Sequence, residues 1–145
     1  GCPAVADPGS AIVELAHKKG ILVKPLVGPS SILLALMGSG MNGQNFAFNG
    51  YLPIDKQERK KTVKALEKTS LEKQQTQIFM ETPYRNDAFF EDLTRTLHPK
   101  TRLCVACDLT LKTETIRTYK VEEWKNMEVS FQKRPAIFLI QKDGY

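Results

Sequence analysis

The chain has 145 residues, of which 41% are hydrophobic and 26% are charged, and its formal net charge is +5. This length supports one ordinary domain with a hydrophobic core, and the composition is that of a globular protein rather than a disordered one. The longest apolar run, residues 32–37, is far shorter than the ~20 residues of a membrane-spanning helix. We therefore expect no membrane span, while the mild positive charge permits a nucleic-acid partner without requiring one.

The opening residues look like an internal loop of a longer protein. Residue 1 is not Met, and Gly1 to Gly9 contain two prolines, two glycines and the turn sequence Asp7-Pro8-Gly9. The opening residues lack the basic region followed by an apolar region that is typical of a signal peptide. Without such a signal, the three cysteines favour free thiols in a reducing cytoplasm. We therefore expect a cytoplasmic protein whose N-terminal part is missing from this chain.

The first 42 residues alternate helix and strand with short connections, as in a parallel sheet. Asp7-Pro8-Gly9-Ser10 predicts a turn that opens a helix, and Gly20 ends that helix. Residues 21–27 then read as a buried strand, and an apolar helix follows over residues 32–37. Because one strand cannot make a sheet, we predict that residues 1–42 are the tail of an N-terminal domain whose other strands lie upstream.

Residues 43–145 predict a second α/β domain. A capping box at Asp55 and Glu58 opens a helix that we expect to run to about Lys68. Pro83 leads into a second helix, and a short helical turn precedes the last strand. Apolar alternation and the turn residues between the runs predict strands at residues 46–52, 76–80, 102–107, 115–121 and 136–140.

Two short motifs have both a structural and a functional interpretation. Gly28-Pro29-Ser30-Ser31 joins a strand to a helix, where free amides bind a polar ligand group or a serine simply caps the helix. Cys104 and Cys107 have CxxC spacing, but positions three apart in a strand point to opposite faces. The two histidines, His17 and His98, fall on predicted helices, so we expect buried free thiols and no metal site.

Three polar segments are also open to two interpretations. The basic run over residues 56–64 is either a solvated helix face or a phosphate-contacting patch for RNA. Glu81-Thr82-Pro83-Tyr84-Arg85 and residues 108–115 each follow a predicted strand end, which is where ligands bind in α/β domains. These two segments either orient a substrate or form an ion pair and a polar loop. None of these motifs alone names a reaction.

The order of the motifs resembles the tetrapyrrole-methylase superfamily, and within it the branch that methylates the 2′-hydroxyl of a cytidine ribose in small-subunit ribosomal RNA. Five segments in the correct order carry the resemblance over essentially the whole chain: residues 1–9, residues 25–30, Gly50-Tyr51-Leu52-Pro53 with the basic residues after it, residues 79–85 and residues 109–114. The chain departs from the branch at Cys2 and Ala4, where Thr and Gly are usual, and at Lys133-Arg134-Pro135-Ala136, where Lys-Gly-Glu is usual.

The resemblance implies two α/β domains around a cleft that holds S-adenosylmethionine, a C-terminal domain with a mixed sheet of about five strands flanked by helices, and a homodimer. It implies cofactor contacts from Cys2, Val5, Ser30, Ser31, Met80, Ala106, Pro135 and Ala136. A ribose hydroxyl must lose a proton, so we expect a base among Glu81, Asp108 and Glu114, with Tyr84 and Arg85 orienting the substrate.

The superfamily's glycine-rich N-terminal loop has no counterpart in residues 1–145. We therefore expect these residues alone to bind S-adenosylmethionine weakly or not at all and to be inactive, which a calorimetric titration checks.

Three functions remain open at this point. Motif order and the basic helix favour an RNA ribose methyltransferase that acts on ribosomal RNA or the small ribosomal subunit. A methylase of tetrapyrrole precursors would use the same fold on an anionic small molecule, and it would need basic residues inside the cleft. A non-catalytic domain that dimerises or binds a partner is the third.

Overall fold

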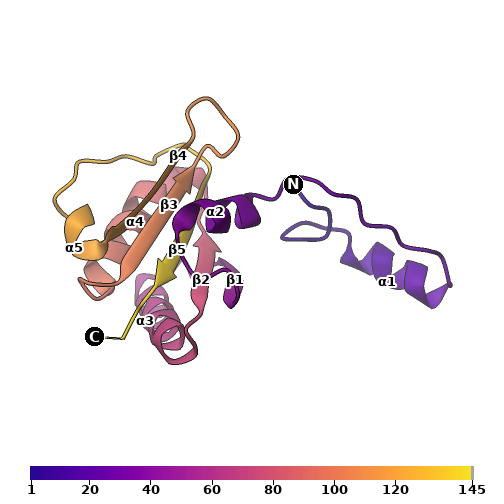
Figure 1. Cartoon of the computed structure of the whole chain (residues 1–145), viewed down its shortest axis with the longest axis horizontal. Helices are drawn as coiled ribbons and strands as arrows, with labels where there is room; N and C mark the ends of the chain where they lie inside the picture. The colour runs from indigo at the N-terminus through magenta and orange to yellow at the C-terminus, as the bar shows by residue number, and fades with distance from the viewer. Residues whose placement is uncertain (145) are drawn as a thin grey trace. The chain divides into compact units, whose positions relative to one another are not determined.

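The computed structural model describes residues 1–144, which form two compact units, residues 1–31 and residues 32–144. The predicted domain boundary after residue 42 concerns the longer protein and stays a prediction. Figure 1 shows the elements of both units in chain order. No helix within residues 1–144 is long and apolar enough to cross a membrane.

The first unit holds one helix, α1 (Ser10–Lys18), at the position that the Asp-Pro-Gly-Ser turn predicts. Gly20 ends the helix with φ of 67°, a left-handed conformation that glycine adopts at little cost. The Ile21 amide then donates to the Ala16 carbonyl at 2.8 Å, which closes the last turn. The predicted helix and its stop signal are thus confirmed.

The predicted buried strand over residues 21–27 is wrong for this structure. The segment has no strand pairing with any part of residues 1–144, and its apolar side chains are exposed, with Leu26 at 90% and Leu22 at 77%. A strand exists only through hydrogen bonds to a partner strand, and a run of apolar residues does not specify that partner. The apolar run therefore predicted a buried strand, but no strand within residues 1–144 pairs with residues 21–27.

The second unit is built on a five-stranded mixed sheet with the strand order β1-β2-β5-β3-β4. The strands are β1 (Phe46–Tyr51), β2 (Thr76–Met80), β3 (Arg102–Cys107), β4 (Thr115–Lys120) and β5 (Ala136–Gln141). β1 and β2 run parallel, whereas β5 pairs antiparallel with both β2 and β3, and β4 pairs antiparallel with β3. The predicted mixed α/β sheet is therefore confirmed.

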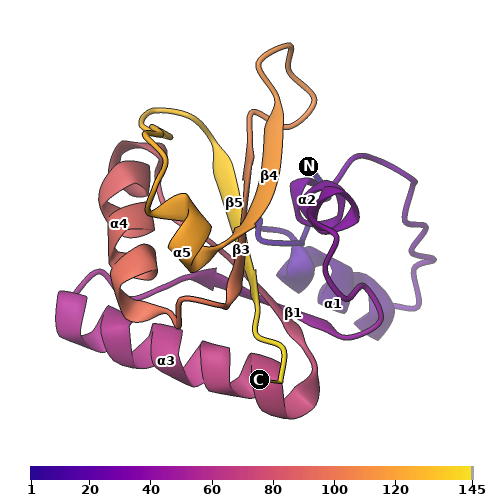
Figure 2. The same cartoon turned by 60° about the vertical axis from the view of Figure 1, so that its left-hand side comes forward.

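Four helices of this unit cover the sheet. They are α2 (Ser31–Ser39), α3 (Lys56–Lys73), α4 (Asn86–Thr96) and the short α5 (Val121–Trp124). Figure 2 shows α3, α4 and α5 on one side of the sheet and α2 on the other. The Asp55 side chain caps α3 by accepting from the Glu58 amide at 2.9 Å, as predicted. The helix extends beyond the predicted end at Lys68 and stops at Lys73. Its left-handed cap is Gln74, so the sequence has no glycine there to mark the end of the helix.

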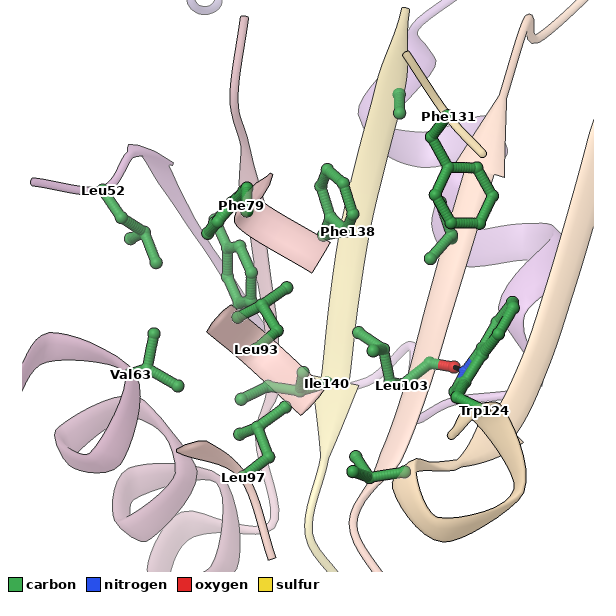
Figure 3. Close-up of a cluster of buried hydrophobic side chains, with 14 of the residues drawn as sticks. Leu52, Val63, Phe79, Leu93, Leu97, Leu103, Trp124, Phe131, Phe138 and Ile140 are labelled. Atoms are coloured by element: carbon green, nitrogen blue, oxygen red, sulfur yellow. Dashed lines mark hydrogen bonds between the residues drawn. The ribbon is translucent and has the colours of Figure 1, made fainter. Parts of the chain in front are cut away.

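A separate apolar cluster lies on each face of the sheet. On the α3, α4 and α5 face, Phe79, Phe89 and Phe138 meet at centroid distances of 5.1 to 6.5 Å. Figure 3 labels Phe79 and Phe138 of this trio. Trp124 closes one end of this cluster, and its Nε1 donates to the Leu103 carbonyl at 2.8 Å. Burying these large side chains between sheet and helices supplies most of the stability of such a layered fold.

The α2 face is the second layer. Ile32, Ala35 and Leu36 of α2 are buried against a cluster that includes Ile78 and Leu139 of the sheet. The two cysteines of β3 fall into different clusters, Cys104 on this face and Cys107 on the opposite one. Their opposite orientation confirms the strand argument against a shared metal ion.

Candidate functional site

Strand ends meet at one edge of the sheet, where β1 ends beside β2. β2 and β3 end there, and the antiparallel strands β5 and β4 begin there. The register fixes the neighbours: Met80 lies opposite Ile137, and Cys107 lies opposite both Ala136 and Thr115. The segments after β2, after β3 and before β5 therefore lie side by side, although they are far apart in the sequence. We call this the β2–β5–β3 edge.

Four of the predicted cofactor residues belong to this edge, but their side chains do not share one face. Met80 and Ala106 lie in the cluster on the α2 face, where Met80 is half-buried and Ala106 is completely buried. Ala136 is 8% exposed and lies in the cluster on the opposite face, while Pro135 is exposed. Met80 and Pro135 are thus the more accessible of the four, and Ala106 is covered by its neighbours.

The other predicted cofactor residues belong to the first unit. There the Cys2 thiol lies 3.5 Å from the Pro29 carbonyl, so the structure brings the opening loop to the Gly-Pro-Ser-Ser turn. Val5 is 52% exposed, and Ser30 and Ser31 lie at the start of α2. Their part in a cofactor site stays a prediction.

Glu81 is held at the end of β2 by two arginines. Its Oε2 lies 3.9 Å from Arg59 Nη1 of α3, and its Oε1 lies 3.9 Å from Arg85 Nη1. Oε1 also accepts from the Thr82 amide at 2.7 Å. Glu81 and Arg59 are 7% and 6% exposed, so this pair joins the end of β2 to α3 beneath the surface.

Arg59 has further partners that keep it inside. Its Nη2 pairs with Asp92 of α4, and its guanidinium lies 5.6 Å from the centroid of the Phe89 ring. A buried charge is tolerated only when it is paired, and here two carboxylates and an aromatic face surround it. Sequence reasoning treated this residue as part of an exposed basic run. Its spacing from the buried Val63, four residues on, is the signal that places it on the core face.

Asp108 follows β3 and forms the second ion pair of the edge. Its Oδ2 accepts from Arg134 Nε at 2.8 Å and from the Thr113 hydroxyl at 2.9 Å. These donors favour the charged form, chiefly the Arg134 guanidinium, and so lower the pKa of the Asp108 carboxyl from its ordinary value of 3.8. Arg134 also donates to the Thr113 carbonyl at 2.9 Å, so it ties together both sides of the loop between β3 and β4.

The same loop contains Glu114, which is exposed and accepts from the Thr110 amide at 2.6 Å. Tyr84 and Arg85 are also exposed, at the end of the neighbouring segment. The structure thus brings the five predicted catalytic residues to the loops of one edge, two of them buried and three accessible. Their roles stay a prediction.

Three residues of these loops have left-handed backbone without being glycine: Asp108 with φ of 51°, Thr110 with φ of 72° and Lys133 with φ of 61°. The conformation is costly for a side chain with a Cβ, and most of all for a β-branched residue such as Thr110. Strain of this kind gathers at functional sites, where the surrounding contacts hold it in place. The backbone therefore supports a functional interpretation of the β2–β5–β3 edge.

Asn86 is the organising residue that the sequence did not reveal. It is completely buried, and its Nδ2 donates to the carbonyls of Phe131 at 3.2 Å and Arg134 at 2.6 Å. The adjacent Asp87 accepts from the Phe131 amide at 2.6 Å, and the Lys133 amide donates to Pro83 at 2.9 Å. The start of α4 thus fixes the loop that leads into β5. The partners of Asn86 lie 45 and 48 residues further along the chain, so the sequence around Asn86 does not indicate this role.

The cysteines of β3 show no reactive character. Burial raises the pKa of both the Cys104 and the Cys107 thiol to about 11. Within residues 1–144, no three or more His, Cys, Asp or Glu side chains are grouped as they would be around a metal ion.

No family model matches the chain. The ribosomal RNA small subunit methyltransferase I of Vibrio cholerae is 32% identical over 100% of this chain and 49% of its own length. The protein of the same name from Escherichia coli O157:H7 is 29% identical over 97% of this chain and 49% of its length. The chain thus spans about half the length of these curated relatives.

Several solved structures share the fold. The methyltransferase CobJ matches with a TM-score of 0.61 at 17% identity, over 98% of this chain and 62% of its own. A uroporphyrin-III C-methyltransferase from Thermus thermophilus matches with a TM-score of 0.52 at 19% identity, over 98% and 63%. Diphthine synthase matches with a TM-score of 0.64 at 14% identity, over 97% and 57%.

The chain is similar along its whole length to proteins named ribosomal RNA small subunit methyltransferase I, and it shares the fold of CobJ and of the uroporphyrin-III C-methyltransferase. The resemblance that rests on motif order is therefore confirmed, and so is the α/β architecture that it implies. The sequence similarity is to about half of proteins named for a ribosomal RNA substrate, whereas the similarity to CobJ lies in the fold.

Proposed function

We propose that the protein to which these residues belong is an S-adenosylmethionine-dependent methyltransferase that methylates a ribose 2′-hydroxyl of small-subunit ribosomal RNA. The observation that carries the proposal is the 32% identity along the entire chain to a protein named ribosomal RNA small subunit methyltransferase I. The geometry agrees with it, because the matched loops gather at one strained edge of the sheet.

The β2–β5–β3 edge suits an adenosine-containing cofactor chemically. It offers the half-buried thioether of Met80 and the partly buried Leu109, which both pack against the cluster on the α2 face and supply apolar surface of the kind that a flat base needs. Pro135 is exposed, so the backbone before β5 is accessible. We propose that these residues contact S-adenosylmethionine. The contacts that the sequence assigns to Cys2, Val5, Ser30 and Ser31 stay a prediction. When bound, the cofactor supplies a methyl group made electrophilic by its sulfonium.

The residues of this chain then have three tasks. Alignment of the acceptor oxygen with the methyl carbon is the main source of acceleration, and we assign it to the loops of the edge, with Tyr84 and Arg85 contacting the RNA. Removal of the hydroxyl proton needs a base, and Glu114 is the best placed of the three carboxylates because it is exposed. Glu81 and Asp108 are held by arginines, so we assign them to positioning the loops.

We propose further that the protein is a cytoplasmic homodimer, as superfamily resemblance implies. Light scattering on the full-length protein tests the oligomeric state, and fractionation of the source cells tests the compartment.

The test is a methyl-transfer assay with the full-length protein and S-adenosylmethionine carrying a labelled methyl group. Small ribosomal subunits lacking the modification are offered in one arm, a uroporphyrinogen-type tetrapyrrole in a second, and already modified subunits in a third. We expect label only in the unmodified subunits, in a nucleotide whose 3′ linkage resists alkaline hydrolysis because its 2′-oxygen is methylated. Label in the tetrapyrrole alone, or in neither substrate, overturns the proposal.

A further inference from the structure

The outer surface of α3 carries a ridge of lysines. Lys56, Lys60, Lys64 and Lys68 follow one another at intervals of four residues, and all four are exposed. Residues four apart lie next to each other on a helix, about 6 Å along its axis. Like charges at this spacing destabilise a helix, so the ridge lowers the stability of α3 rather than raising it.

Little within the protein neutralises the ridge. Among residues 1–144, the ion pair recorded for these lysines is Lys68 Nζ with Glu72 Oε1, at 3.8 Å and on the surface. Glu67, the acid in the middle of the helix, is buried and accepts from the Thr101 hydroxyl at 2.7 Å. Glu67 therefore serves the interior of the protein. The exposed acids next to the lysines are Asp55 and Glu58 at the start of the helix and Glu72 near its end.

The buried Arg59 sets the direction of the ridge. Its contacts with Asp92 and Glu81 fix the first turns of α3 next to the end of β2, which is part of the β2–β5–β3 edge. From there the helix runs on to Lys73, and Figure 2 shows it as the longest helix of the unit. The ridge thus starts beside the candidate site and extends about 18 Å away from it.

We propose that this ridge, Lys56, Lys60, Lys64 and Lys68, binds the sugar–phosphate backbone of the RNA that flanks the methylated nucleotide. The inference rests on the proposed function for the identity of the polyanion. Evenly spaced, solvated ammonium groups suit successive phosphates and carry no base specificity, so the contact raises affinity for any RNA sequence and leaves the choice of nucleotide to the edge.

The first experiment measures RNA binding without cofactor. Full-length wild-type protein is compared with Lys60→Gln/Lys64→Gln and with a matched control, Lys100→Gln/Lys125→Gln, which removes the same charge from exposed positions outside α3. The probe is a single-stranded RNA of about 20 nucleotides, titrated at several salt concentrations. Each lost phosphate contact lowers the slope of log affinity against log salt by about 0.7, so we expect the ridge variant to lose about 1.4.

We also expect the ridge variant to bind the RNA roughly tenfold more weakly at 0.1 M salt, and the control to change less than about twofold. The thermal unfolding midpoint of the ridge variant should equal or exceed that of wild type, because repulsion between lysines of α3 is relieved. An unchanged slope in the ridge variant, or an equal loss in the control, overturns the inference. So does a loss that appears with anionic lipid vesicles and not with RNA.

The second experiment separates this inference from the proposed function. With small ribosomal subunits as substrate, the ridge variant should show a KM raised about tenfold and an unchanged kcat. If wild type methylates the subunits and the ridge variant has the same KM, the ridge inference is wrong and the proposed function stands. If wild type methylates no RNA but the ridge variant still loses its salt slope, the proposed function is wrong and the ridge stands as an RNA-binding surface.

Discussion

Arg134 Nε lies 2.8 Å from Asp108 Oδ2, and this ion pair joins the segment before β5 to the end of β3. The two residues are 26 positions apart in the sequence and become neighbours because β5 pairs with β3. The ion pair holds the strained Asp108 and the loop between β3 and β4 in place. We therefore expect the geometry of the β2–β5–β3 edge to depend on this ion pair.

The first prediction concerns this pair and pH. Because the folded-state pKa of Asp108 lies below 3.8, its stabilisation is complete above that pH and is lost as the pH falls through the lowered pKa. Urea unfolding of the full-length wild type, Asp108→Asn, Arg134→Gln and the double variant should therefore give a favourable coupling energy at pH 7 that declines as the pH is lowered below 3.8. A coupling energy that is unchanged at pH 3 contradicts the assignment.

The second prediction concerns the base. Glu114→Gln in the full-length protein should lower kcat by about a hundredfold or more with little change in unfolding free energy, because the side chain is exposed and acts on the substrate proton. Asp108→Asn should instead lower stability together with activity. The control is Glu128→Gln, another exposed carboxylate in a different loop. Undiminished turnover in Glu114→Gln removes this residue from the mechanism.

The third prediction concerns the thiols. With pKa values of about 11, Cys104 and Cys107 have roughly one thiolate in a thousand molecules at pH 8, and both are buried. Brief treatment of the native protein with iodoacetamide, followed by peptide mass spectrometry, should leave both unmodified and modify them only after denaturation. Rapid alkylation of either in the native state would show that β3 is more accessible than the structure indicates.

The fourth prediction concerns the contact between α2 and β4. A Cβ at Gly38 would lie 2.6 Å from Ile116 Cδ1, so Gly38→Ala should destabilise the protein by about 1 kcal/mol even though alanine favours helix. Ile116→Val removes that Cδ1, and the double variant should be more stable than the sum of the single effects predicts. Additive changes in unfolding free energy would show that the two groups do not collide.

The local sequence pattern predicted the helices and strands of the second unit well. It did not predict which strands pair with one another. Strand 102–107 was predicted to the residue, because its apolar run ends in polar turns on both sides. The insertion of β5 between β2 and β3 could not be predicted, because strand order depends on pairing between segments about 60 and 30 residues apart. The prediction of a strand over residues 21–27 was wrong for the same reason, because an apolar run does not specify the strand with which it pairs.

The candidate site was predictable as a set of loops and not as a set of contacts. The rule that ligands bind at strand ends indicated Glu81 and Asp108, and the structure does place them at one edge. Their arginine partners, Arg59 and Arg134, come from distant segments. The sequence around Glu81 or Asp108 therefore does not indicate these two ion pairs. The buried Asn86 was equally invisible, because its role consists of hydrogen bonds to a loop 45 to 48 residues away.

The central claim is that the β2–β5–β3 edge forms one wall of the cofactor site. Hydrogen–deuterium exchange of the full-length protein, with and without S-adenosylhomocysteine, tests it most directly because the amides after β2 and β3 and before β5 lie in loops. We predict slower exchange in peptides covering residues 80–85, 106–111 and 133–137, and no change at the C-terminal half of α3. Slower exchange elsewhere, with these three segments unaffected by a ligand that demonstrably binds, would contradict the account.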